Sequence, residues 1–209
     1  MNALWSTASL MTANLIRTRG PRSGSESGPS IYLTFDDGPH PVHTPHLLSV
    51  LERHGAKGTF FLIGQKAEKH PQVVRRILDG GHAIGNHSMR HPKMRALPRS
   101  AQWAEIDLAD VVLARFDGRR RHAFRPPNGR VTAWAVASSI WRRQPLVLWT
   151  IDSLDYKLSA DAVAHALRER KLVDGDVILF HDDAARAAEA LDALLPAWLA
   201  DGYTFPPTA

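Results

Sequence analysis

The stretch Ile31-Tyr32-Leu33-Thr34-Phe35-Asp36-Asp37-Gly38-Pro39 places two adjacent carboxylates at the end of an apolar run. The apolar part, residues 31–35, is typical of a buried strand, and Gly38-Pro39 predicts the turn that ends it. Neighbouring side chains of a strand point to opposite faces, so Asp36 and Asp37 can serve different partners, one a metal and the other a substrate. Asp-Asp-Gly-Pro also occurs in turns that only end a strand, so the interpretation needs a second signal.

The second signal is a pair of histidines in Asn86-His87-Ser88-Met89-Arg90-His91-Pro92. His87 and His91 are four residues apart, so one helical turn would place both imidazoles on the same face. Two imidazoles at that spacing suit a borderline-soft cation such as zinc, and a carboxylate can complete a three-ligand site with open positions. Among 11 histidines an isolated pair would more often be a surface or core pair, but Asp37 makes a metal site the better explanation.

The chain resembles the polysaccharide deacetylases that share a NodB-homology domain, carbohydrate esterase family 4. The resemblance runs from about residue 31 to residue 205, and five motifs occur in the family's order. They are TFDDG at 34–38, HSMRH at 87–91, RPPNG at 125–129, DSLDY at 152–156 and LFHD at 179–182. The resemblance implies a metal-dependent hydrolase that removes acetyl groups, usually from N-acetylated sugars. It also implies a distorted, partly open β/α barrel.

The resemblance assigns the central chemistry to five residues. Asp37, His87 and His91 would hold one divalent metal, preferably zinc, with cobalt or nickel as alternatives. Such a metal lowers the pKa of a bound water and polarises the acetyl carbonyl. Asp36 would be the general base, and His181 the general acid that protonates the leaving nitrogen.

Arg125 would sit against Asp36 and keep that carboxylate ionised, because a nearby positive charge favours the charged form. The family usually has an aromatic residue at the position of Asn128, and its backbone N–H helps to form the oxyanion hole. Asparagine keeps the N–H, so we expect the chemistry to survive and the wall of the substrate groove to change.

Three further residues complete the predicted site. Asp155 matches the aspartate that supports the acid or base, and Tyr156 takes a place usually held by tryptophan. A tyrosine still offers a flat face for a sugar ring. Leu179 would line the pocket for the acetyl methyl group. Asp182 and Asp183 could orient the imidazole of His181 or cap the next helix.

Apolar runs alternate with helical patterns along the chain, which predicts parallel strands joined by helices. The motifs follow the ends of apolar runs, and in a β/α barrel those ends meet at one face, so we expect one shared pocket. The seven predicted strands are 31–35, 58–63, 82–85, 122–125, 146–150, 177–180 and 203–205. The predicted helices are 44–54, 71–79, 100–116, 132–141, 159–170 and 184–200.

The 209 residues suit one domain, and we expect a catalytic domain over residues 31–209 after a flexible tail over residues 1–30. The formal charge of +5 comes from scattered basic residues, and no zinc-finger, RNP or P-loop pattern supports nucleic-acid binding. Cysteine is absent, which excludes disulfides and thiolate metal sites. No stretch is long and apolar enough to span a bilayer.

The sequence also leads to expectations about cellular location, oligomeric state and binding partner. The first positive charge, Arg17, comes after the apolar part of the first segment, which is the wrong order for a secretory signal. We therefore expect a cytoplasmic protein, with export as the alternative. We also expect a monomer. The expected partner is an acetylated glycan. The same site could instead cleave an O-acetyl ester or a non-sugar amide, and a catalytically silent glycan-binding protein is the third alternative.

Overall fold

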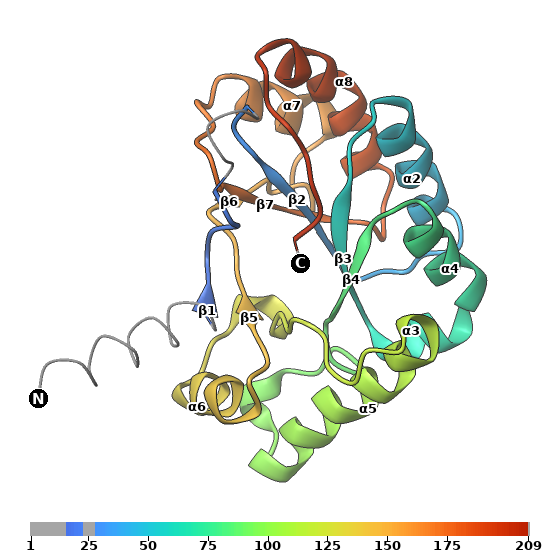
Figure 1. Ribbon diagram of the computed structural model, residues 1–209, viewed down its shortest axis with the longest axis vertical. Helices are drawn as coiled ribbons and strands as arrows, with labels where there is room; N and C mark the ends of the chain where they lie inside the picture. Colours follow the sequence, from blue (N-terminus) through green and yellow to red (C-terminus); the bar gives the residue numbers. More distant parts are fainter. Residues whose placement is uncertain (1–15, 23–27, 209) are drawn as a thin grey trace, which may run out of the picture.

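The protein has two sets of parallel strands, which together form an open barrel (Figure 1). The computed structural model describes residues 16–22 and 28–208. The smaller sheet pairs β1 (Ile16–Arg17) with β5 (Leu146–Val147). The larger sheet has the order β4-β3-β2-β7-β6, with bounds Ala83–Asn86, Gly58–Leu62, Tyr32–Asp36, Val177–His181 and Ile151–Asp152.

Phe124 joins the two sheets, because it bridges Asn86 at the end of β4 and Leu146 of β5. The strands therefore follow one another from β6 through β7, β2, β3 and β4 to β5 and β1. Within the part of the chain that the structure describes, no strand pairing between β1 and β6 closes the ring. This confirms the expected distorted and partly open β/α barrel with parallel strands.

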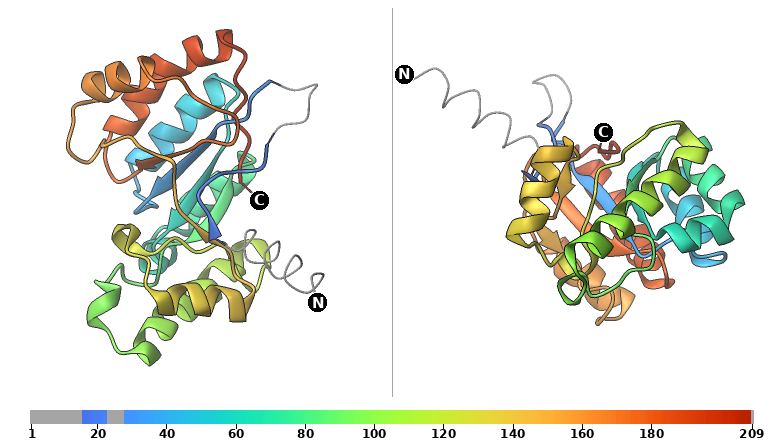
Figure 2. Two further views of the ribbon diagram at one scale, coloured as in Figure 1. Left: turned by 90° about the vertical axis from the view of Figure 1, so that its left-hand side faces the viewer. Right: turned by 90° about the horizontal axis from the view of Figure 1, so that it is seen from below.

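The helices lie on the outside of the strands (Figures 1 and 2). Helix α8 packs against both α2 and α7, and α3 packs against α5. Their bounds are α2 His43–Arg53, α3 Gly64–Lys69, α4 Pro71–Asp79, α5 Arg99–Asp117, α6 Ala133–Arg142, α7 Ala160–Arg168 and α8 Arg186–Ala200, with short 3-10 helices at Met94–Ala96 and Pro127–Gly129.

The apolar core lies between the main sheet and the helices that cover it. Phe35 of β2 stacks on Phe60 of β3 and on Phe180 of β7, with ring centroids 4.7 and 6.0 Å apart. Burying each of these rings stabilises the fold by about 1.5–3 kcal/mol. Thr34 and Asp36 alternate with Phe35 along β2, so their side chains point to the inner face of the sheet. The inner face is thereby left for polar groups.

Three predicted strands differ from the observed ones. Residues 122–125 and 203–205 form only isolated bridges, at Phe124 and Thr204. The third, residues 146–150, is shorter than predicted because the main-chain oxygens of Val147 and Leu148 accept hydrogen bonds from a buried arginine side chain. Three residues separate the end of β5 from the start of β6, a strand that lies outside the predicted ranges.

The helices lie close to their predicted ranges. Helix α4 has its predicted bounds, and Gly80 follows it. Helix α7 begins after Ser159, whose hydroxyl accepts a hydrogen bond from the backbone N–H of Ala162, which is the expected start. Helix α3 was not predicted, because its sequence GQKAEK has no apolar periodicity.

The predicted flexible tail, residues 1–30, lies partly outside the described residues. Within it, residues 16–22 make contacts with the rest of the chain, and the flexibility of the tail stays a prediction. Strand β1 pairs with β5, Arg19 forms an ion pair with Asp176 at 2.9 Å, and the oxygen of Pro21 accepts a hydrogen bond from the hydroxyl of Tyr32. None of the described helices has the length and apolarity needed to cross a membrane.

Candidate active site

His87 follows directly after β4 and is fixed by one hydrogen bond. Its Nδ1 lies 2.8 Å from the main-chain oxygen of Arg125, and the side chain is 2% exposed. A carbonyl oxygen only accepts hydrogen bonds, so Nδ1 must carry the proton. The lone pair of Nε2 is then available, which is the state that a metal-binding imidazole needs.

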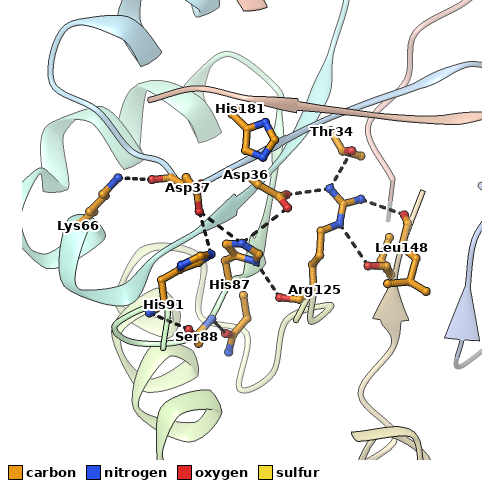
Figure 3. A network of polar contacts seen from close by, with 12 residues as sticks. Thr34, Asp36, Asp37, Lys66, His87, Ser88, His91, Arg125, Leu148 and His181 are labelled. Atoms are coloured by element: carbon orange, nitrogen blue, oxygen red, sulfur yellow. Dashed lines mark hydrogen bonds and ion pairs between the residues drawn. The ribbon is translucent and has the colours of Figure 1, made fainter. Parts of the chain in front are cut away.

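Asp37 and His91 complete a three-residue group with His87 (Figure 3). Asp37 Oδ1 lies 3.5 Å from Nε2 of His87 and 3.2 Å from Nε2 of His91. The candidate ligand atoms all lie within 4.8 Å of one another. Asp37 Oδ1 is buried and has no hydrogen-bond partner, so a cation at this point would satisfy it. Two imidazoles and one carboxylate therefore fit a divalent metal.

The electrostatics of this group keep the carboxylate ionised. Burial alone would raise the pKa of Asp37, but the imidazoles of His87, His91 and His181 outweigh burial and lower it to about 2. Burial and the neighbouring His87 lower the pKa of His91, which favours the neutral, ligating imidazole. Both changes favour the protonation states that bind metal.

The loop that carries the two histidines differs from the predicted helical turn. Residues 87–91 are not helical, and Ser88 and His91 have positive φ values of 69° and 55°. Side-chain hydrogen bonds hold this left-handed backbone. Asn86 Oδ1 accepts from the N–H of Ser88 at 2.8 Å, and Ser88 Oγ accepts from the N–H of His91 at 3.0 Å. The imidazoles therefore meet through a tight loop and not along a helix.

Asp36 lies beside the group and is paired with Arg125. Asp36 is 4% exposed, its Oδ1 is 2.8 Å from a terminal nitrogen of Arg125, and its Oδ2 is 3.7 Å from Nε2 of His87. Arg125 itself is fully buried and also donates to Thr34 Oγ1 at 2.9 Å. The structure thus places Arg125 against Asp36, as the sequence predicts.

His181, at the end of β7, is held by Asp155. Its Nδ1 lies 2.7 Å from Oδ1 of Asp155, and its backbone N–H donates to Oδ2 of Asp155 at 2.7 Å. Burial alone would lower the pKa of His181, but Asp155, together with Asp36 and Asp37, raises it to about 9. Because Nδ1 is held by Asp155, Nε2 is left to act on a substrate.

These side chains share one pocket of about 500 Å³. Arg125 and Asp155 stand behind it, where they contact Asp36 and His181, and the other eight predicted site residues line it. The lining residues are Asp36, Asp37, His87, His91, Asn128, Gly129, Trp149, Asp152, Tyr156, Leu179, His181, Asp183 and Arg186.

The pocket wall contains an aromatic residue that the sequence analysis missed. Trp149 lines the pocket and packs against Gly129, where a Cβ atom would come within 2.4 Å of the indole. Asn128, which precedes that glycine, is exposed and has a φ of 57°. Trp149 therefore provides an aromatic surface close to Asn128, which stands where the family usually has an aromatic residue. An aromatic residue three positions before Asp152 was the only available signal.

Tyr156 and Asp152 are two further residues of the pocket wall. The Tyr156 ring lies edge-on to His181, with centroids 5.3 Å apart, and its hydroxyl donates to Oδ2 of Asp152 at 3.3 Å. Asp152 also accepts from the backbone N–H of Leu154. Asp152 had no role in the sequence analysis, and this geometry makes it a support for Tyr156.

Asp182 does not orient His181, which was one of the two roles considered for it. Its carboxylate is buried and accepts a hydrogen bond from the hydroxyl of Thr44. Burial raises the pKa of Asp182 to about 7, although Thr44 and Lys66 act in the opposite direction. A Cβ atom on Gly38 would come within 2.2 Å of this carboxylate, which explains why glycine follows the two aspartates.

Comparisons with known proteins agree with the geometry. The family model described as polysaccharide deacetylase matches residues 23–140. A peptidoglycan-N-acetylglucosamine deacetylase of Bacillus cereus is 33% identical over 188 residues, which cover 88% of this chain and 68% of the relative. A chitooligosaccharide deacetylase of Sinorhizobium fredii is 38% identical over 166 residues, which cover 78% of this chain and 75% of the relative.

A solved structure extends the likeness to the fold. The peptidoglycan N-acetylglucosamine deacetylase Bc1960, in complex with an N-hydroxybenzamide compound, superposes with a TM-score of 0.85 at 31% sequence identity. The superposition covers 97% of this chain and 95% of the solved one. The similarity of fold therefore extends over nearly the whole chain.

Proposed function

This chain belongs to the polysaccharide deacetylase family, and we propose that it hydrolyses the N-acetyl amide of glycans that contain N-acetylglucosamine. The observation that carries the proposal is the grouping of Asp37, His87 and His91 beside Asp36 and His181 in one pocket. Amide hydrolysis needs an activated water, a stabilised oxyanion and a proton for the leaving amine. Each need has a candidate residue at this site.

Asp37, His87 and His91 would hold one divalent metal, and we propose zinc, with cobalt or nickel as alternatives. When bound, the metal would lower the pKa of a water molecule and polarise the acetyl carbonyl. The N2O donor set is typical of catalytic zinc sites, which keep a position open for water or substrate. The fixed tautomer of His87 and the unpartnered Oδ1 of Asp37 support this assignment.

The chain's own residues would move the protons. Asp36, whose Oδ1 is paired with Arg125 at 2.8 Å, would take a proton from the attacking water. His181, kept protonated by Asp155, would donate from Nε2 to the leaving nitrogen. The general base and the general acid have different partners, Arg125 for Asp36 and Asp155 for His181. Different surroundings of this kind allow one group to accept a proton and the other to donate one in the same pocket.

Three lining residues would position the sugar and its acetyl group. The backbone N–H of Asn128 would donate to the developing oxyanion, which asparagine supports as well as an aromatic residue does. Leu179 is 3% exposed and would contact the acetyl methyl group. Tyr156 is 44% exposed and would offer its ring to a sugar face, with Trp149 as a further aromatic surface.

Acetate release tests the proposal. The metal-loaded protein should release acetate from N-acetylglucosamine oligomers, lose that activity to a chelator and regain it with zinc. Matched O-acetylated sugars and non-sugar N-acetyl amides distinguish the proposed reaction from the two enzymatic alternatives. Binding of these oligomers without acetate release under every metal condition would support the silent glycan-binding alternative.

The metal assignment has its own test. Elemental analysis should find one divalent ion per chain in the wild type and strongly reduced metal in the His87→Ala, His91→Ala double variant, because a three-ligand site has no spare donor. Undiminished metal in that variant would contradict the ligand set. We also propose a monomer, which sedimentation of the same preparation checks. The cytoplasmic location remains a prediction from the sequence.

A further inference from the structure

Arg186 is a cation in the catalytic pocket without a counter-charge. It is the first residue of α8 and lines the pocket together with Tyr156 and His181. Its Nε is buried and has no hydrogen-bond partner. The buried arginines of the described chain, Arg125 and Arg142, each have a carboxylate within ion-pair distance, whereas no ion pair of Arg186 occurs among the described residues.

The carboxylates of the pocket are occupied or too distant. Asp36 is paired with Arg125, and Asp37 belongs to the three-residue metal group. Asp152 accepts hydrogen bonds from the hydroxyl of Tyr156 and from a backbone N–H. Asp183 also lines the pocket, and no ion pair that it makes within 4.0 Å occurs in the described part of the chain. No carboxylate in residues 16–22 and 28–208 therefore forms an ion pair with Arg186.

The position of Arg186 on its helix is also unfavourable without a ligand. Cations stabilise the C-terminal turn of a helix, and at the N-terminal turn they add to the positive end of the dipole. Arg186 lies at the N-terminal end of α8, a helix of 15 residues. An anion in the pocket would interact favourably with both the guanidinium and this end of the helix.

We infer that Arg186 binds a carboxylate of the glycan substrate, an inference that rests on the proposed deacetylase function. A guanidinium binds a carboxylate through two parallel N–H···O hydrogen bonds. Among the described residues, Arg186 is the one arginine or lysine that lines the pocket, which matches a single negative charge better than a phosphate dianion. A pocket of about 500 Å³ holds few sugars, so the carboxylate belongs to the reacting sugar or its direct neighbour.

Two oligosaccharides that differ only in this group test the inference. One is a peptide-free tetrasaccharide of alternating N-acetylglucosamine and N-acetylmuramic acid, with its lactyl carboxylates free, and the other has those carboxylates converted to methyl amides. The metal-loaded wild type should show kcat/KM for acetate release about tenfold or more higher on the acid, the scale of a hydrogen bond to a charged group. A tetrasaccharide with a uronic acid in place of the lactyl group shows which source of carboxylate is preferred.

Arg186→Gln should reduce the acid-to-amide ratio of kcat/KM to within about twofold of one. Arg120→Gln, at an exposed arginine, is the matched control and should keep the wild-type ratio. Equal rates of the wild type on acid and amide would overturn the inference. An Arg186→Gln variant that slows both substrates by the same factor would also overturn it, because Arg186 would then act on the fold.

Calorimetric titration with the same two oligosaccharides separates this inference from the proposed function. If neither releases acetate, the proposed reaction is wrong, but tighter binding of the acid that is lost in Arg186→Gln still supports the carboxylate site. Equal affinity of the wild type for the acid and the amide contradicts that site whatever the reaction is.

Discussion

Replacing Arg125 by methionine should strongly destabilise the fold. Methionine keeps an apolar stem of similar length but removes the charge and every donor. The guanidinium is fully buried and bonds to Asp36 at 2.8 Å, to Thr34 at 2.9 Å, and to the main-chain oxygens of Val147 and Leu148 at 3.2 and 3.0 Å. The substitution therefore leaves one buried carboxylate and two carbonyl groups without these partners.

The magnitude follows from what remains unpaired. Removing one partner of a buried ion pair costs about 3–5 kcal/mol, because the other charge stays buried. We therefore expect Arg125→Met to lower the free energy of unfolding by about 4 kcal/mol. Total stabilities are about 5–15 kcal/mol, so the variant would be close to unfolding. At about 2–4 °C per kcal/mol for a chain of this size, the melting temperature should fall by roughly 8–16 °C.

Urea unfolding in the presence of a chelator measures this without a contribution from metal. Arg125→Met, Asp36→Asn and the double variant form a cycle with the wild type. The double variant should be more stable than Arg125→Met alone, because the unpaired buried carboxylate is gone. The exposed control Arg120→Met should change stability by less than about 0.5 kcal/mol. A loss below about 1 kcal/mol in Arg125→Met, or a double variant no more stable than it, would refute the reasoning.

Three further predictions concern acid–base groups. Asp36→Asn should keep its metal by elemental analysis and lose about two to four orders of magnitude in turnover, and near-normal turnover would assign the proton transfer to another group. Asp155→Asn removes the carboxylate that raises the pKa of His181, so the alkaline limb of the pH–rate profile should move to lower pH; an unmoved limb would exclude His181 as the acid. Burial alone would lower the pKa of His122, but Asp110 and Asp117 outweigh burial and raise it. The stabilisation from charged His122 is therefore full below its ordinary pKa of about 6.5 and is lost as the pH rises through the raised value, so urea midpoints of the wild type and His122→Asn should differ more at pH 6 than at pH 9.

The grouping of Asp37, His87 and His91 could be predicted because it depends on residue types that few other roles require. These residues combine a carboxylate and two imidazoles, a donor set that suits a divalent metal. The left-handed loop of Ser88 and His91 could not be predicted, because side-chain hydrogen bonds to the backbone create it. The pocket residues Trp149 and Arg186 were missed for a related reason: only folding brings them into one pocket with residues that are distant in the sequence.

The fold was predictable where periodicity is strong and unclear where strands are very short. Helices α4, α5 and α7 have apolar positions at helical spacing or recognisable ends, and they lie close to their predicted ranges. Strands β1 and β6 have two residues each, too few for any period. Their pairing depends on partners far away in the sequence, so only the structure could identify them.

The unclosed side of the barrel has a consequence for association. An exposed sheet edge normally offers a row of free N–H and C=O groups on which another chain can add a strand. In the described part of the chain the two borders of the opening are β1 and β6, which are two residues long, and β6 ends in the charged Asp152. Such short and charged borders are a poor template for amyloid-like stacking or for edge-to-edge dimers. Within the described residues, the opening therefore offers little strand edge for pairing with another chain.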